Sequence, residues 1–305
     1  MSVIEEIKKL KKEKNAVILA HYYVPAEVQQ IADYIGDSFY LSRVAVDLDA
    51  QLIVFCGVGF MGESAKILSP HKTVLMPAAD ADCPMAHMIT ADRIAEVREE
   101  YEDLAVVCYV NSTAEIKAVS DVCVTSSNAV KVVSNIPQKN IFFVPDNNLG
   151  RYVAEKLPEK HFIFHDGFCH VHKSIHAAEL QAAKDACPDA LVLTHPECTE
   201  DVVAMSDFVG STSEIIDFAT QSDCKKFIIC TEMGVFFELQ QKNPDKKFYS
   251  VGHRQFCPNM KKVTIDKVEQ VLEKLGSGEL EEITLSDEIL TRAAKPLQRM
   301  LELAK

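Results

Sequence analysis

The sequence has no long apolar segment. Nowhere does it approach the roughly 18 consecutive apolar residues that a membrane-spanning helix requires. Residues 1–14 carry charge throughout and lack the apolar core of a secretory signal peptide. We therefore expect a protein that is neither inserted into a membrane nor secreted, and we predict a cytoplasmic location.

Positive charge is also scarce. The chain has 32 Lys and Arg against 45 Asp and Glu, which gives a formal net charge of −13. No block of basic residues offers the footprint that a nucleic-acid-binding protein needs. With 305 residues, 48% of them hydrophobic, the chain is long enough for a large core and by length alone for about two domains. These features favour a globular enzyme that acts on small molecules.

Disulfides are not expected, although the chain has ten cysteines. Without a secretory signal, cysteines are typically reduced thiols, metal ligands or small buried apolar residues. No C-x₂-C pair, the usual half of a structural zinc site, is present.

The most informative feature is a threefold repeat with a period of about 87 residues. His21, Tyr109 and His195 occupy equivalent places in the three units. An aspartate follows each of them after 12 residues, and a hydroxyl residue follows after 17. These two sets are Asp33, Asp121 and Asp207, and Ser38, Ser126 and Thr212. Each unit closes on a cysteine at one further equivalent place: Cys83, Cys169 and Cys257.

Each unit is predicted to alternate strands and helices. Short apolar runs at 16–20, 52–56 and 73–76 are typical of buried parallel strands, and amphipathic stretches at 60–68 and 149–157 are typical of helices. The alternation predicts right-handed βαβ units, which makes the fold class α/β. Further helices are expected at 3–12, 91–100, 176–186 and 289–303. Because no linker interrupts the chain, we expect three repeats packed around a shared axis, at 1–87, 88–173 and 174–305, the last including the C-terminal helices.

The repeated polar residues are expected to meet in one cavity, because reactive groups gather at the carboxyl ends of parallel strands. The first set directly follows the first strand of each unit. The hydroxyl set is expected to open a helix, where backbone N–H groups favour an anion. Two residues beyond the first set come Tyr23, Asn111 and Glu197. For Asp33, Asp121 and Asp207 we favour a structural role in turning the chain.

The three repeat-equivalent cysteines are candidate metal ligands. Most isolated cysteines simply pack in the core, and we assign that role to Cys56, Cys108, Cys123, Cys187, Cys224 and Cys230. Cys198, beside Glu197, stays undecided. Three convergent thiolates suit a metal, but zinc ordinarily takes a fourth ligand and an iron–sulfur cluster usually takes four cysteines. Three cysteines would leave one iron of a cluster without a protein ligand, and an iron with such an open site is typical of a Lewis acid.

Two histidines, His21 and His195, stand out because they are equivalent in the repeat. His172 is a weaker candidate, three residues after Cys169. The other seven histidines are expected to be surface or core residues.

At this level of detail the sequence resembles a known family, quinolinate synthase of NAD biosynthesis. The motifs that carry the resemblance are HYY (21–23), IGDS (35–38), GFMGESAKIL (59–68), DCPM (82–85), YVNSTAEIKA (109–118), TSSNAV (125–130), CHVH (169–172), HPEC (195–198), GST (210–212) and CPNMK (257–261). The resemblance covers essentially the whole chain, and the motifs together are highly specific.

The resemblance implies three αβα domains around a pseudo-threefold axis and a [4Fe–4S] cluster bound by Cys83, Cys169 and Cys257. It implies condensation of iminoaspartate with dihydroxyacetone phosphate to quinolinate, phosphate and water, with a functional link to an aspartate-oxidising enzyme. Residues that match family active-site positions are His21, Tyr23, Ser38, Tyr109, Asn111, Ser126, His172, His195, Glu197, Ser211, Thr212, Met260 and Lys261. The family usually has His-Asn-Tyr-Gln where this chain has His-Tyr-Tyr-Val, so roles for the Asn and Gln side chains do not carry over.

Chemistry suggests the roles of these residues. An open iron would polarise the departure of a substrate hydroxyl. Glu197 and Tyr109 are the candidates for proton transfer, with Tyr23 as a further participant and His21 as a further catalytic candidate. Hydroxyls, histidines and helix N-termini would hold carboxylates and phosphate. Two alternatives remain at this point: an iron–sulfur hydro-lyase acting on a hydroxy acid, and a non-catalytic iron–sulfur redox sensor.

Overall fold

The computed structural model describes residues 2–305 and contains three four-stranded parallel sheets. The first is formed by β1 (Ala16–His21), β2 (Tyr34–Gly36), β3 (Leu52–Cys56) and β4 (Thr73–Leu75). The second is formed by β5 (Leu104–Tyr109), β6 (Val122–Val124), β7 (Asn140–Val144) and β8 (His161–Phe164). The third is formed by β9 (Leu191–Thr194), β10 (Phe208–Val209), β11 (Lys226–Cys230) and β12 (Lys247–Ser250).

Helices flank each sheet. The first unit has α1 (Val3–Lys14), α2 (Ala26–Gln29), α3 (Ser38–Asp47), α4 (Gly59–Leu68) and the 3₁₀ turn η1 (Pro84–His87). The second has α5 (Ala91–Glu100), α6 (Ala114–Ala118), α7 (Ala129–Ser134), α8 (Asn147–Lys156) and α9 (His170–Lys173). The third has α10 (Ala177–Ala186), α11 (Glu200–Val203), α12 (Thr212–Gln221), α13 (Val235–Lys242) and η2 (Met260–Lys262), after which come α14 (Ile265–Glu273) and α15 (Asp287–Leu303).

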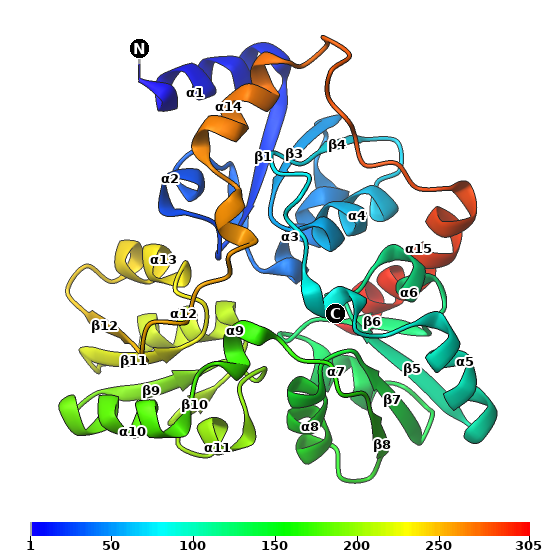
Figure 1. Cartoon of the computed structure of the whole chain (residues 1–305), viewed down its shortest axis with the longest axis vertical. Helices are drawn as coiled ribbons and strands as arrows, with labels where there is room; N and C mark the ends of the chain where they lie inside the picture. The colour runs from blue at the N-terminus through cyan, green and yellow to red at the C-terminus, as the bar shows by residue number, and fades with distance from the viewer. Residues whose placement is uncertain (1) are drawn as a thin grey trace.

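The repeat is confirmed by the strand order. Each sheet places its strands in the order second, first, third, fourth, and every pairing is parallel. Figure 1 shows the three sheets as three lobes around a common centre. The predicted α/β class with three αβα repeats is therefore confirmed. Among residues 2–305, no helix combines the length and apolar character needed to cross a membrane.

The repeated aspartates are structural, as expected. The carboxylates of Asp33, Asp121 and Asp207 accept a hydrogen bond from a backbone N–H of the first strand of their unit, at 2.8, 2.7 and 2.7 Å. The N–H of each aspartate donates to the carbonyl of the same strand residue at 2.9 to 3.0 Å. This pair of bonds ties the loop before the second strand to the first strand in all three units.

The last two helices do not pack on the third sheet. α14 lies against α1 and β3, and α15 lies against α6, β6 and α4, as Figure 1 also shows. Their apolar faces supply buried residues such as Leu272 and Leu297 to the core of the first two units. The prediction from the sequence groups these helices with the third unit because they follow it in the chain. The apolar face of an amphipathic helix, however, packs on any apolar surface that is otherwise uncovered.

A lysine caps the same helix end in each unit, a repeat that the sequence analysis did not identify. The ammonium groups of Lys72, Lys160 and Lys246 donate to backbone carbonyls at or just beyond the C-terminal ends of α3, α7 and α12. The Lys246 ammonium contacts three carbonyl oxygens, those of Ala219, Thr220 and Ser222, at 2.6, 3.2 and 2.8 Å. Positive charge at this end complements the helix dipole and satisfies carbonyls that the helix leaves unpaired.

Replacement of Lys246 by methionine is therefore expected to lower the free energy of unfolding by about 2 kcal/mol, because charge-assisted bonds to carbonyls are lost while the stem volume stays. The measurement is urea unfolding followed by circular dichroism. Lys247→Met is the matched control, since the neighbouring lysine is exposed. It should change the free energy by no more than about 0.5 kcal/mol. Equal effects of the two variants would show that the cap contributes nothing.

Candidate active site

A cavity lies where the three units meet, with a volume of about 770 Å³ including its open mouth. It is lined from all three units. Fourteen of the sixteen residues proposed from the sequence are in its wall: His21, Tyr23, Ser38, Cys83, Tyr109, Asn111, Ser126, Cys169, His172, His195, Glu197, Thr212, Cys257 and Met260. The repeat predicted that twelve of these side chains share one cavity, whereas His172 was singled out by its place three residues after Cys169 and Met260 by the family resemblance.

The strands explain why these residues meet. His21 and Tyr109 are the last residues of β1 and β5, and His195 directly follows β9. Each of these strands lies between two others in its sheet. Parallel strands carry functional groups at their carboxyl ends, and here three such ends face one centre.

The hydroxyl set is only partly placed as expected. Ser38 and Thr212 are the first residues of α3 and α12. Ser126 does not open a helix, because the side chain of Asn128 accepts a hydrogen bond from the N–H of Thr125 and holds a turn ahead of α7. The Ser126 hydroxyl lies 3.1 Å from Nε2 of His195 instead.

Each of the three cysteines is held by a carboxylate that accepts its backbone N–H. Asp146 Oδ2 accepts from Cys169 at 3.1 Å, and Glu232 Oε1 accepts from Cys257 at 2.9 Å. Asp146 and Glu232 are fully buried and equivalent, each the second residue after the third strand of its unit. In the first unit that position is Val58, and the N–H of Cys83 donates to its exposed neighbour Asp82 at 2.8 Å.

The thiols of the three cysteines fit a cationic group. Burial raises the pKa of Cys83 to about 12, and the charge of Cys257 raises it as well. Burial, then the charges of Glu197 and Cys83, raises the pKa of Cys169 well above its usual range. Thiolates at these places are thus disfavoured by burial and by one another, and bound iron would compensate both effects. The donor set therefore fits an iron–sulfur cluster.

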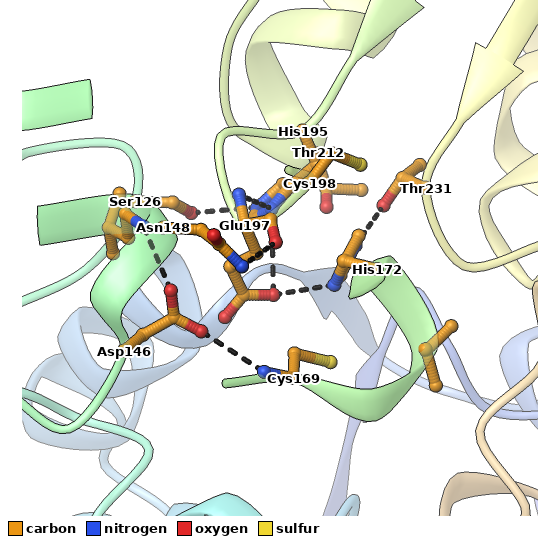
Figure 2. A network of polar contacts seen from close by, with 12 residues as sticks. Ser126, Asp146, Asn148, Cys169, His172, His195, Glu197, Cys198, Thr212 and Thr231 are labelled. Atoms are coloured by element: carbon orange, nitrogen blue, oxygen red, sulfur yellow. Dashed lines mark hydrogen bonds and ion pairs between the residues drawn. The ribbon is translucent and has the colours of Figure 1, made fainter. Parts of the chain in front are cut away.

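A polar network links several side chains at or just behind the cavity wall. His172 Nδ1 lies 2.6 Å from Glu197 Oε2, and His172 Nε2 lies 2.9 Å from the Thr231 hydroxyl, as Figure 2 shows. The Thr231 oxygen is 2.8 Å from the hydroxyl of Tyr23, which also lies 2.6 Å from that of Thr212. The network contains residues of all three units.

Glu197 is an ionised carboxylate in this network. Burial opposes its ionisation, but the charge of the His172 imidazole, whose Nδ1 lies 2.6 Å from Oε2, outweighs it and lowers the pKa of Glu197 to about 2. Its second oxygen, Oε1, is buried and has no hydrogen-bond partner within residues 2–305, and the same holds for Oδ1 of Asn111. Buried acceptors without partners cost free energy unless a ligand supplies donors. Both atoms are therefore suited to a bound substrate.

His21 and His195 are neutral and share one tautomer. Nδ1 of His21 accepts from the N–H of Tyr23 at 3.2 Å, and Nδ1 of His195 accepts from the N–H of Glu197 at 3.3 Å. An accepting Nδ1 carries no proton, so the proton is on Nε2. Burial lowers the pKa of each imidazole to about 3. Each histidine therefore presents one N–H donor without a net charge.

Comparison with known proteins agrees with this site. A sequence profile of the family described as Quinolinate synthetase A protein matches residues 5–302. A quinolinate synthase of Caldicellulosiruptor saccharolyticus is 51% identical over 299 residues, which cover 98% of this chain and 97% of that protein. Those of Clostridioides difficile and Fusobacterium nucleatum are 49% and 51% identical over 300 residues, covering 98% of this chain and 97% and 99% of the relatives. The chain belongs to the quinolinate synthase family.

The resemblance expected from the motifs is thus confirmed, and the chain is an enzyme of NAD biosynthesis. The two positions that depart from the family pattern are buried. The Tyr22 ring packs in an apolar cluster with Leu193 and Ile215 of the third unit, and Val24 lies in the main core. Both side chains serve packing between and within units.

Two of the residues matched to quinolinate synthase positions lie behind the cavity wall. Ser211 caps α12 by accepting from the N–H of Glu214. Lys261 donates to Glu232 Oε1 at 2.7 Å and to the carbonyl of Tyr23 at 2.6 Å, which links the first and third units. The geometry gives both residues a supporting position.

Three buried residues of the site were missed from the sequence: Asp146, Glu232 and Thr231. Asp146 and Glu232 share one column of the repeat with Val58, so the alignment contained a signal for them. Thr231 directly follows β11, and the equivalent residues after β3 and β7 are Gly57 and Pro145. No feature of the sequence indicated that the Thr231 hydroxyl belongs to the site.

One further group in the described residues could hold a single ion. Donor atoms of Cys169, His172 and Glu197 lie within 4.8 Å of one another. A single ion bound there would occupy the carboxylate and the imidazole of the polar network. Metal analysis of variants, described below, separates this arrangement from a cluster on three cysteines.

Proposed function

We propose that this chain condenses iminoaspartate with dihydroxyacetone phosphate to quinolinate, with loss of phosphate and water, using a [4Fe–4S] cluster bound by Cys83, Cys169 and Cys257. The observation that carries the proposal is that three repeat-equivalent cysteines and the Glu197 network line the same cavity. When bound, such a cluster has one iron without a protein ligand, which supplies Lewis acidity toward a substrate hydroxyl.

The proton transfers are proposed for Glu197, Tyr109 and Tyr23. Ring formation from these substrates requires protons to move at carbons next to carbonyl and imine groups. The free Oε1 of Glu197 is an acceptor inside the cavity, and its low pKa keeps it ionised before substrate binds. Burial raises the pKa of Tyr109 well above its usual range, so its hydroxyl is a proton donor. A positioned acid or base of this kind contributes about 10²–10⁴-fold to rate.

The anionic groups of the substrates are proposed to bind to neutral donors. His21 and His195 each offer an Nε2–H, although that of His195 already lies near Ser126. Ser38 and Thr212 add hydroxyls at the N-terminal ends of α3 and α12, where the helix dipole favours negative charge. An acidic protein therefore needs no basic surface to bind these substrates. Because water hydrolyses an imine, we propose a functional link to an aspartate-oxidising enzyme that supplies iminoaspartate.

The test is anaerobic purification, followed by iron and sulfide analysis and an assay of quinolinate formation. We expect about four iron and four sulfide per chain. We also expect quinolinate from dihydroxyacetone phosphate and a source of iminoaspartate. Full iron and sulfide without quinolinate would refute the substrates, and a single bound ion with turnover would refute the cluster.

The carboxylates that hold the cysteines lead to a second expectation. Asp146→Asn and Glu232→Gln each remove one of two acceptor oxygens that bind backbone N–H groups. Supporting contacts of metal ligands typically contribute 10–100-fold to metal affinity, so we expect iron to pass to a chelator about 10-fold faster or more. The measurement is iron release from anaerobic protein.

Asp207→Asn is the matched control, because Asp207 also accepts a backbone N–H but lies at the far end of β9. It should lower stability without changing the rate of iron release. If all three variants release iron at the wild-type rate, the carboxylates do not support the cysteines.

A further inference from the structure

Three side chains on one side of the cavity are arranged as ligands of a single ion. The donor atoms of Cys169, His172 and Glu197 all lie within 4.8 Å of one another, and Figure 2 shows the three side chains around a common space. Only 1% of the His172 side chain and 3% of the Glu197 side chain are exposed. Zinc binds thiolate, imidazole and carboxylate at about 2.0–2.3 Å, so two donor atoms on one zinc ion are at most about 4.6 Å apart. Small side-chain movements therefore bring all three donors onto one ion.

The three cysteines proposed as cluster ligands do not have this spacing. In residues 2–305, Cys169, His172 and Glu197 are the only three such side chains whose donor atoms meet the 4.8 Å limit, so the thiols of Cys83, Cys169 and Cys257 are spread more widely. An iron–sulfur cluster contains several irons and can span such a set, whereas a single ion cannot. The geometry thus separates two metal sites that have only Cys169 in common.

Two buried atoms of the group made by Cys169, His172 and Glu197 lack partners. Nδ1 of His172 lies 2.6 Å from Oε2 of Glu197, but the contact does not have the alignment of a hydrogen bond. Nδ1 and the second carboxylate oxygen, Oε1, are both buried without a hydrogen-bond partner in the described part of the chain. Buried polar atoms without partners cost free energy, and a cation bound between them would offset that cost.

Contacts behind these side chains hold them in place for an ion. When Nδ1 of His172 is the ligand, the imidazole proton is on Nε2, which then donates to the Thr231 oxygen at 2.9 Å. The Asn148 side chain donates to the carbonyl of Glu197 at 3.1 Å, and the N–H of Cys169 donates to a buried carboxylate. Metal sites in proteins are typically built with supporting bonds of this kind, which orient the ligands.

We propose that the chain binds one zinc ion at Cys169, His172 and Glu197 when its cluster is absent, with a water molecule in the fourth position. The mixed set of sulfur, nitrogen and oxygen donors suits zinc, which such sites bind more tightly than ferrous iron. Zinc binds the Cys169 thiolate, whose proton passes to solvent, and it also occupies the Glu197 carboxylate. The bound ion therefore blocks reassembly of the cluster until a chelator removes it. This block rests on the proposed function, because it takes Cys169 to be a cluster ligand.

The test measures zinc binding by the full-length protein after its iron has been removed with a chelator under anaerobic, reducing conditions. We expect about one zinc ion per chain in competition with a chromogenic chelator. Cys169→Ser, His172→Ala and Glu197→Gln should each weaken zinc binding about 10-fold or more, since even supporting contacts contribute 10–100-fold to metal affinity. Cys83→Ser and Cys257→Ser are the matched controls, and their zinc affinity should stay within about twofold of wild type.

Two further measurements use the wild-type protein. Cobalt bound in place of zinc should show the charge-transfer absorption of one cobalt–thiolate bond, not of three. Iron and sulfide added to zinc-loaded protein should rebuild no cluster in the time that zinc-free protein needs, and removal of the zinc with a chelator should restore reassembly. Visible absorption follows both reactions without an assay of turnover.

Absence of zinc binding, its loss in Cys83→Ser and Cys257→Ser, or wild-type zinc affinity of His172→Ala and Glu197→Gln would overturn the site. Cluster reassembly at the normal rate with zinc bound would overturn the block. Circular dichroism shows whether each variant folds, and if His172→Ala does not, His172→Gln replaces it under the same criteria. Because zinc binding needs no turnover, quinolinate formation without zinc binding refutes only the zinc site, and zinc binding without quinolinate formation refutes only the proposed function.

Discussion

Cys169→Ser is expected to lose the iron–sulfur cluster and all quinolinate formation, and Cys83→Ser and Cys257→Ser are expected to do the same. Each cysteine supplies one of only three proposed protein ligands, so no remaining side chain compensates for its loss. A serine hydroxyl stays protonated near neutral pH and is a poor ligand for iron compared with a thiolate. The measurements are iron and sulfide per chain after anaerobic purification, the visible absorption of the cluster, and turnover.

Two other cysteines provide the controls. Cys56 is fully buried in β3 and Cys187 lies at the end of α10, so their serine variants should keep the cluster, with some loss of stability for Cys56→Ser. The competing arrangement is one ion on Cys169, His172 and Glu197. If Cys83→Ser and Cys257→Ser retained their metal while Cys169→Ser lost it, that single-ion site would replace the cluster.

Glu197→Gln is expected to fold, to keep its iron and sulfide and to bind quinolinate, but to lose about 10²-fold or more in turnover. Glutamine preserves the shape of the side chain and cannot accept a proton under these conditions. The amide also removes the negative charge that lies 2.6 Å from His172. Both effects act on proton transfer and leave the cysteine ligands in place. Steady-state kinetics, metal analysis and product binding measure the three properties separately.

The repeat makes the Glu197 prediction specific. The equivalent residues are Tyr23 and Asn111, so the framework of three units does not require an acid at this position. Asn111→Asp is a useful companion, since it adds a carboxylate at the equivalent place and should not rescue Glu197→Gln. Near-normal turnover of Glu197→Gln with a full cluster would move the acid–base role to Tyr109 or Tyr23.

Most of the site could be predicted because the repeat fixes positions along the chain. Residues that end the same strand in three equivalent units, such as His21 and His195, must meet if the units share an axis. The contacts between units could not be predicted in this way. Thr231 contacts both Tyr23 and His172 because of the way the three units are rotated relative to one another. No spacing in the sequence indicates that rotation.

Two other features escaped prediction for different reasons. Lys72, Lys160 and Lys246 recur with the period of the repeat. A lysine is usually exposed, however, and its contact with backbone carbonyls can be recognised only when the position of the helix end is known. The positions of α14 and α15 escaped because an amphipathic pattern indicates that a helix face is covered without indicating which surface covers it.

The placement of α14 and α15 also sets the order in which the protein can fold as it is synthesised. The surfaces of α4, α6 and β6 that α15 covers belong to the first two units, yet the helix that covers them ends at Leu303. At ordinary rates of translation, on the order of ten seconds or more separate the emergence of β6 from that of α15. During this time the nascent first and second units expose the apolar surface that α15 buries in the folded protein. We therefore expect both units to reach their final stability only after α15 has emerged from the ribosome.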